Sequence, residues 1–189
     1  MKKLVLLNGI AVGEVEASGN DEQDVLAVRE FLESRGLRKE VTPFQGAYNA
    51  ALAFANTAAY LYDRDLRRPP RRGQSVAPFV VNATFAIELY FKALALKHGK
   101  TLRGHELAQL HQNLPQAALS GIEQAIPSCA REHSLTGPPD FARYVRELND
   151  VYSEWRYYYE KEQAGKVEIE PTIFIMRVLH EACFPPTDV

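Results

Sequence analysis

Two different spacings of hydrophobic residues divide this chain. Near the N-terminus, two short apolar runs, LVLL and IAV, flank Asn8-Gly9. Asn-Gly supplies the two positive-φ residues of a tight hairpin turn, so we predict a β-hairpin over residues 3–17. A helix over 21–35, ended by Gly36, is expected to follow. Because an isolated two-stranded hairpin is marginal in water, the hairpin must pack on that helix or on a partner.

From Pro43 onward the apolar positions recur with the period of a helix. The predicted helices cover residues 45–65, 76–98, 104–113, 116–131, 141–162 and 171–183. The second of them is apolar on nearly every side, which is typical of the central helix of a bundle. We therefore predict a mainly α fold: an up-and-down helical bundle over residues 41–189, preceded by a β-hairpin and helix attachment over residues 1–40.

Composition excludes several classes of protein. The 46% hydrophobic and 24% charged residues are ordinary for a globular protein, and a net charge of −2 gives no overall attraction to nucleic acid or to an anionic membrane. The first apolar run is too short for a signal peptide, and no uninterrupted run approaches the roughly 18 residues of a membrane span. We predict a cytoplasmic protein without a membrane partner.

Motifs for a metal or a cofactor are absent from the sequence. The two cysteines stand far apart, without the spacing of a zinc site. His105 and His111 are six residues apart and do not share a helical face well. The glycine motifs that hold the phosphates of nucleotide cofactors are also missing. We therefore predict neither a metal nor a cofactor.

Polar residues interrupt the middle of the predicted central helix. Glu88 and Lys92 stand four residues apart with the acid first, the better order for a helical ion pair. A buried carboxylate needs a partner, because an unpaired buried charge is strongly destabilising. Either this edge of the helix is open to water, or Glu88 is paired. We treat Glu88 and Lys92 as part of a candidate pocket or interface.

One histidine follows the central helix in the segment GHEL. His105 is expected in the first turn of the helix 104–113, whose Leu107, Leu110 and Leu114 form a core stripe. It would then cap the helix or lie at the edge of the core, bonded to backbone. The alternative is a general acid–base group, since histidine changes its charge near neutral pH.

A basic segment connects the first two predicted helices of the bundle. Four arginines, Arg67, Arg68, Arg71 and Arg72, surround Pro69-Pro70, which stiffens the loop. Arginine-rich loops bind phosphates, so these four side chains are candidate contacts for RNA. Alternatively the loop binds an acidic protein partner, or it is a solvated loop that keeps the protein soluble.

The stretch EWRYYYE lies near the end of the predicted helix 141–162. One continuous apolar stripe runs along this helix, formed by Phe141, Val145, Leu148, Tyr152, Trp155 and Tyr159. Arg156 lies beside the stripe and could pair with Glu160 or reach Glu88. Tyr157 points about 160° away from Trp155 at 100° per residue, and it is the candidate for an interface with another chain.

The order of three segments resembles a known family. FAIELYFKALAL, then GHELAQLHQNLP after a glycine-bounded turn, then WRYYYE in a long helix, are similar to HEPN domains (higher eukaryote and prokaryote nucleotide-binding) over residues 45–183. The resemblance implies a helical bundle that commonly dimerises. Many members are ribonucleases, often toxins of toxin–antitoxin or other defence systems, and others have lost catalysis and serve as binding or scaffold domains.

The resemblance also provides a test for catalysis. Active members carry an arginine followed, after four to six residues, by a histidine, and the pair acts at the dimer interface. None of the five histidines of this chain has an arginine at that spacing. Lys100 precedes His105 at the right distance, but an ammonium lacks the planar fork that a guanidinium offers a phosphate. The resemblance therefore implies a member without the ribonuclease signature.

Three functions follow from these observations. The favoured one is a non-catalytic, homodimeric HEPN-like protein that binds RNA, a nucleotide or a protein partner, in a toxin–antitoxin or defence system. The second is a metal-independent ribonuclease with a displaced active site, in which His105 and Arg156 are catalytic and Arg103 assists. The third is a purely structural interaction module, such as one half of an operon-encoded pair.

Overall fold

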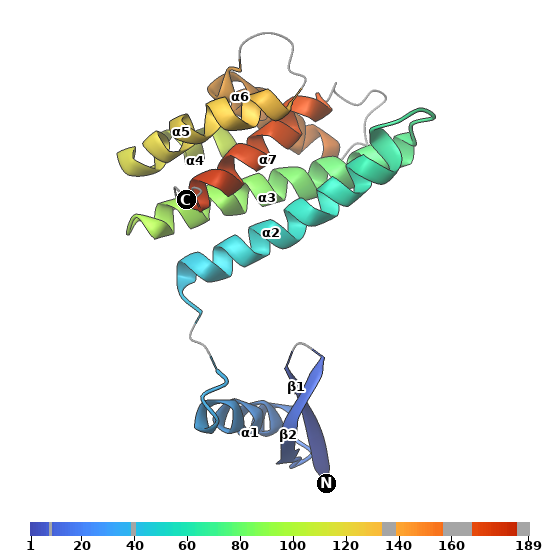
Figure 1. The fold of residues 1–189 in the computed structure, drawn as a ribbon, viewed down its shortest axis with the longest axis vertical. Helices are drawn as coiled ribbons and strands as arrows, with labels where there is room; N and C mark the ends of the chain where they lie inside the picture. The colour runs from blue at the N-terminus through green and yellow to red at the C-terminus, as the bar shows by residue number, and fades with distance from the viewer. Residues whose placement is uncertain (8, 39–40, 134–138, 157–167, 185–189) are drawn as a thin grey trace. The chain divides into compact units, whose positions relative to one another are not determined.

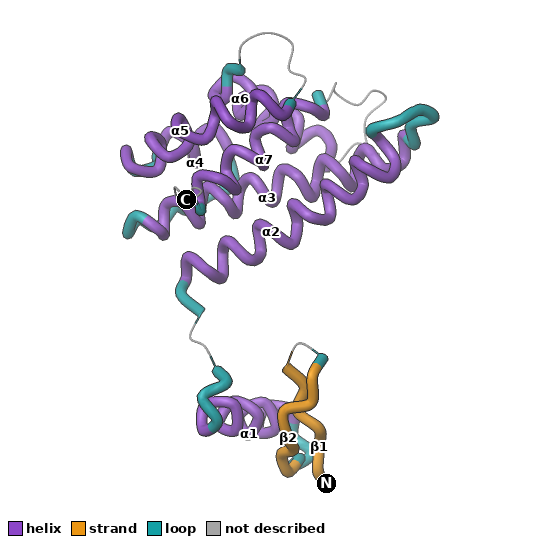
Figure 2. Tube along the Cα trace, viewed as in Figure 1, coloured by secondary structure: helices purple, strands orange, loops and turns teal. Residues whose placement is uncertain are grey.

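The structure of this protein is a computed structural model. It describes residues 1–7, 9–38, 41–133, 139–156 and 168–184. For residues 150–156 it describes the backbone only. The chain divides into two compact units, Met1–Val41 and Thr42–Val189. The mainly α fold with a small N-terminal hairpin is confirmed (Figure 2).

The first unit is a hairpin with one helix packed against it. β1 (Lys2–Leu7) and β2 (Ile10–Glu16) are antiparallel, with Leu7 paired to Ile10. The predicted turn includes Asn8, which lies outside the described residues. The carboxamide of Asn20 accepts two backbone hydrogen bonds at the start of α1 (Asp21–Ser34) and so caps that helix. The hairpin therefore packs on the helix that follows it, which is one of the two predicted alternatives.

Two close contacts hold this helix to the hairpin. A Cβ atom at Gly13 would lie 2.3 Å from Phe31 Cζ, so a larger residue does not fit there without displacing the ring. Asp24 is buried and accepts hydrogen bonds from Lys3 Nζ at 2.9 Å and from Ser18 N at 2.6 Å. These donors lower the pKa of Asp24 to about 2, so the carboxylate stays charged at neutral pH.

The second unit is a bundle of helices (Figure 1). Its elements are α2 (Pro43–Leu61), a π-helical turn η1 (Tyr62–Leu66), a 3-10 turn η2 (Gly73–Ser75), α3 (Val76–Lys97), α4 (Leu107–Gln112), α5 (Gln116–Glu132), α6 (Phe141–Arg156) and α7 (Ile169–Cys183). α2 and α3 run antiparallel side by side, and α7 packs against α3 and α5.

The bounds differ from the prediction by more than one residue at α2, which covers Pro43–Leu61 where 45–65 was predicted, and at the starts of α4 and α7. α4 begins at Leu107, so His105 precedes the helix instead of lying in its first turn. The cause is Gly104, whose positive φ of 92° turns the chain before the helix begins. α7 begins at Ile169, so Pro171 lies within its first turn rather than at its first position. Proline is tolerated there because the first N–H groups of a helix have no partner within the helix.

α3 is the central helix of the bundle, as its apolar sequence predicts. Phe79, Ile87 and Phe91 have no exposed surface. By length and composition the segment Gly73–Lys97 could also cross a membrane, but 67% of its most apolar stretch is buried inside the bundle. Burial against the surrounding helices accounts for this apolar sequence.

A row of rings joins α3, α4 and α6. The His111 ring centroid lies 5.8 Å from that of Phe91 and 5.5 Å from that of Phe141. Phe141, Val145 and Leu148 are buried, so the first part of the predicted stripe on α6 is confirmed. The predictions for the rest of the stripe fall outside the described side chains, at Tyr152, Trp155 and Tyr159.

Candidate functional site

A buried carboxylate on α3 contacts two basic side chains. Glu88 is 2% exposed, and its Oε1 accepts a hydrogen bond from Lys92 Nζ at 2.7 Å and lies 3.0 Å from His105 Nδ1. We call these three residues the Glu88 cluster. The alternative that this edge of the helix is open to water is therefore wrong. The carboxylate is paired, by the residue one helical turn away and by a histidine from the next connection.

Contacts from α6 hold the chain next to His105. Asn149 Nδ2 donates to Glu106 Oε2 at 3.0 Å, and Asn149 Oδ1 accepts from Ala108 N at 3.4 Å. These bonds attach the first residues of α4 to α6, and so help to place His105 against α3. Sequence reasoning missed Asn149, because nothing in its position beside the apolar stripe of α6 indicates a contact with α4.

The geometry leaves His105 available for chemistry. Its side chain is 75% exposed, while Glu88 lies at its Nδ1. When Nδ1 donates to the carboxylate, Nε2 is left to accept a proton or to contact a ligand. The expectation of a helix-capping or core-edge histidine bonded to backbone is therefore wrong, since this ring is exposed and its partner is a carboxylate.

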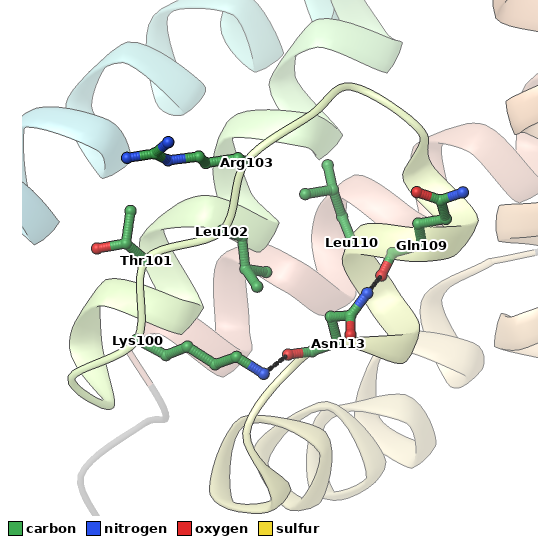
Figure 3. A pocket seen from close by; sticks show the side chains of 7 residues that line it. All are labelled: Lys100, Thr101, Leu102, Arg103, Gln109, Leu110 and Asn113. Carbon is green, nitrogen blue, oxygen red and sulfur yellow. Dashed lines mark hydrogen bonds between the residues drawn. The ribbon is translucent and has the colours of Figure 1, made fainter.

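A surface pocket of about 330 Å³ lies between the connection Lys100–Arg103 and α4 (Figure 3). Lys100 and Leu102 extend toward α4, and Lys100 Nζ donates to Asn113 O at 2.6 Å. Arg103 extends in another direction, and no hydrogen bond or ion pair joins it to His105 in the described part of the chain. Arg103 is therefore near His105 in sequence without being joined to the Glu88 cluster.

The basic loop, residues 67–72, is exposed as expected. A buried carboxylate, Asp65, contacts the arginine at the end of this loop. Asp65 has no exposed side-chain surface and accepts hydrogen bonds from Arg64 Nη2 and Ser75 Oγ, both at 2.5 Å. Arg72 Nη1 lies 3.6 Å from Asp65 Oδ1. Hydrogen bonds from Arg64 and Ser75 lower the pKa of Asp65 to about 2, so this carboxylate is ionised at neutral pH. The loop is thereby attached to the junction of α2 and α3.

Two of the four arginines of the basic loop are paired and two are not. Arg67 Nη1 lies 3.3 Å from Asp63 Oδ1, and Arg72 contacts Asp65. Arg68 and Arg71 are exposed and have no carboxylate partner among the described residues. These two guanidinium groups are the ones that remain available to an anion.

The remaining candidates fall on parts that the structure does not describe in full. Arg156 lies in the last turn of α6, where only the backbone is described, and Tyr157 and Glu160 lie outside the described residues. Arg156 follows Asn149 by two helical turns, so the two positions share one face of α6. Its pairing with Glu88 or Glu160 stays a prediction.

Within the described ranges, no group of three or more His, Cys, Asp or Glu residues could hold a metal ion.

Comparison with known families gives a match over more than half of the chain. The family model described as HEPN domain matches residues 73–184. The match runs from η2 through α7 and so includes the Glu88 cluster and the pocket, whereas α2, the basic loop and the N-terminal unit precede it. No curated protein and no solved structure matches the chain.

Proposed function

This chain belongs to the HEPN domain family, and on that premise we propose that it is a non-catalytic homodimer that binds RNA through its basic loop, in a toxin–antitoxin or other defence system. Membership of the family indicates a nucleotide- or RNA-related function or a toxin–antitoxin role. The absence of an arginine at ribonuclease spacing before any histidine supports binding over cleavage.

One observation carries the RNA proposal. Arg68 and Arg71 of the basic loop are exposed and have no carboxylate partner among the described residues. The loop itself is anchored, because Arg72 at its end contacts the buried Asp65. Guanidinium groups match the geometry of phosphate oxygens, and an anchored loop loses less conformational entropy on binding than a free one. A local patch of this kind is what phosphate binding needs in a protein whose net charge is −2.

Replacing Arg68 and Arg71 together by alanine is expected to weaken RNA binding and to reduce its dependence on salt. Each phosphate contact that is lost should lower the slope of log K against log salt concentration by about 0.7 to 0.9. Fluorescence anisotropy with a labelled RNA, titrated at several salt concentrations, measures both the affinity and the slope.

The matched control is Arg131→Ala with Arg143→Ala, which removes the same charge from exposed positions on α5 and α6. It should leave the slope unchanged. An equal effect of both double variants would assign the binding to overall charge and not to the loop. If the wild-type protein binds no RNA, the proposal is wrong, and an acidic protein encoded by a neighbouring gene becomes the candidate ligand. Sedimentation of the same samples at micromolar concentration tests the homodimer.

One observation favours RNA cleavage as a second candidate function. A buried carboxylate lies at Nδ1 of the exposed His105, which is how a carboxylate orients a general acid–base histidine. In that case purified protein cleaves RNA in the presence of a chelator, with Arg156 as the second catalytic residue and Arg103 assisting. His105→Ala should then lower the rate by about 100-fold or more. His98→Ala, at another exposed histidine, is the control. Cleavage that survives His105→Ala would contradict this assignment.

A further inference from the structure

One aromatic ring of the bundle is exposed beside the basic loop. Tyr60, in the last turn of α2, is 59% exposed. Phe184 is also exposed, but its ring lies 4.6 Å from the ring of Tyr48 and 5.6 Å from that of Phe44, so other rings pack against it. No second aromatic ring packs against Tyr60 in the part of the chain that the structure describes. Tyr60 is therefore an exposed ring without an aromatic neighbour next to the junction that carries the basic loop.

An arginine holds the Tyr60 ring in place. The guanidinium carbon of Arg64 lies 4.9 Å from the centroid of the ring, and Arg64 Nη1 donates to the Tyr60 hydroxyl at 3.2 Å. Arg64 stands one helical turn after Tyr60, so the two side chains share a face of the helix. The result is a flat aromatic group stacked with a flat cation, which we call the Tyr60 platform.

Contacts connect the Tyr60 platform to the basic loop. Arg64 also donates to the buried Asp65, from Nε at 3.0 Å and from Nη2 at 2.5 Å. The same carboxylate lies 3.6 Å from Arg72 Nη1 at the end of the loop. One carboxylate therefore fixes the platform on one side and the loop on the other. Tyr60, Arg64, Asp65 and Arg72 thus form one connected set of contacts between the end of α2 and the end of the basic loop.

We infer that the RNA bound by the basic loop is single-stranded and that one of its unpaired bases stacks on the Tyr60 platform. This inference rests on the RNA binding proposed above. Every base has a π face, and stacking on tyrosine or on an arginine plane is how proteins bind single strands without reading their sequence. In a duplex the bases are stacked on each other and cannot reach the ring. The Tyr60 platform thus favours single-stranded RNA over duplex RNA, while Arg68 and Arg71 bind the phosphates.

Binding of the full chain to a single-stranded RNA, to the duplex of the same sequence and to an oligonucleotide with abasic sites tests the inference. The wild-type protein should prefer the single strand. Tyr60→Ala should weaken binding to the single strand by about 5- to 150-fold, the range measured when a stacking side chain is removed. Tyr60→Phe keeps the ring and should recover most of that loss. On the abasic oligonucleotide Tyr60→Ala should have no further effect, because no base is present to stack.

Val25→Ala is the matched control, since it removes another exposed apolar side chain, 67% exposed, from α1 in the N-terminal unit. It should bind like the wild type. The inference is overturned, with RNA binding intact, if Arg68→Ala/Arg71→Ala lowers the salt slope while Tyr60→Ala binds the single strand normally. Equal affinity for duplex and single strand also overturns it. If the wild type binds none of the three oligonucleotides, both this inference and the proposed function fail.

Discussion

Replacing Lys92 by methionine is expected to lower the free energy of unfolding by about 3 kcal/mol. Methionine keeps an apolar stem of similar length but removes the ammonium that lies 2.7 Å from Glu88 Oε1. The carboxylate is 2% exposed, so without the ammonium it is a buried charge that has lost its closest partner. His105 would be its remaining partner. Urea unfolding followed by circular dichroism measures the change.

Two further variants show whether the stability lost in Lys92→Met comes from leaving Glu88 as an unpaired buried charge or only from losing one ion pair. Glu88→Met combined with Lys92→Met removes both charges and should recover most of the loss, because apolar replacement of a buried pair is often close to neutral. Glu147→Gln breaks an exposed pair with Arg143 and should cost less than about 1 kcal/mol. An equally small loss for Lys92→Met would show that Glu88 is hydrated in solution.

Phe91→Ala is expected to destabilise the bundle by about 3–5 kcal/mol, the range for deleting a fully buried phenylalanine ring. Phe91 has no exposed surface, and its ring lies next to that of His111, which in turn contacts Phe141. Truncation leaves a cavity where α3, α4 and α6 meet. Chemical denaturation measures the loss, and Val81→Ala on the exposed side of α3 should change stability by less than about 1 kcal/mol.

The same variant tests whether the two compact units fold independently. If they do, hydrogen exchange of the β1–β2–α1 unit, residues 1–38, should be unaffected by Phe91→Ala, while exchange within the bundle accelerates. Equal acceleration in both parts would show that the units unfold together and would contradict a separate N-terminal domain.

Local patterns were sufficient for most of the fold. The two apolar runs of residues 3–17 form an antiparallel pair, Asn20 caps a helix, and the apolar segment over residues 76–98 forms the central helix. Each of these depends on the chemistry of a few neighbouring residues. The start of α4 was misplaced for a local reason as well. A positive φ at Gly104 delays the helix, and the spacing of leucines does not reveal that angle.

The candidate site was less accessible to sequence reasoning. Glu88 and His105 are 17 residues apart, and Asn149 contacts the chain beside His105 from 41 residues away. The Tyr60 platform was missed entirely. Tyr60 and Arg64 stand at ordinary helical spacing, and only the exposure of the ring and the shared contact with Asp65 distinguish them from a solvated pair.

The sequence by itself determined the helical class, the resemblance to HEPN domains, the absence of the ribonuclease spacing and the identity of the charged candidates. Only the tertiary structure decided which of these charged side chains are buried and paired inside the protein and which stay exposed without a carboxylate partner. Glu88 and Asp65 are buried and paired, whereas Arg68 and Arg71 have no carboxylate partner among the described residues. The physical reason is that burial and pairing depend on how segments far apart in sequence pack together, and spacing along one helix carries no information about that packing.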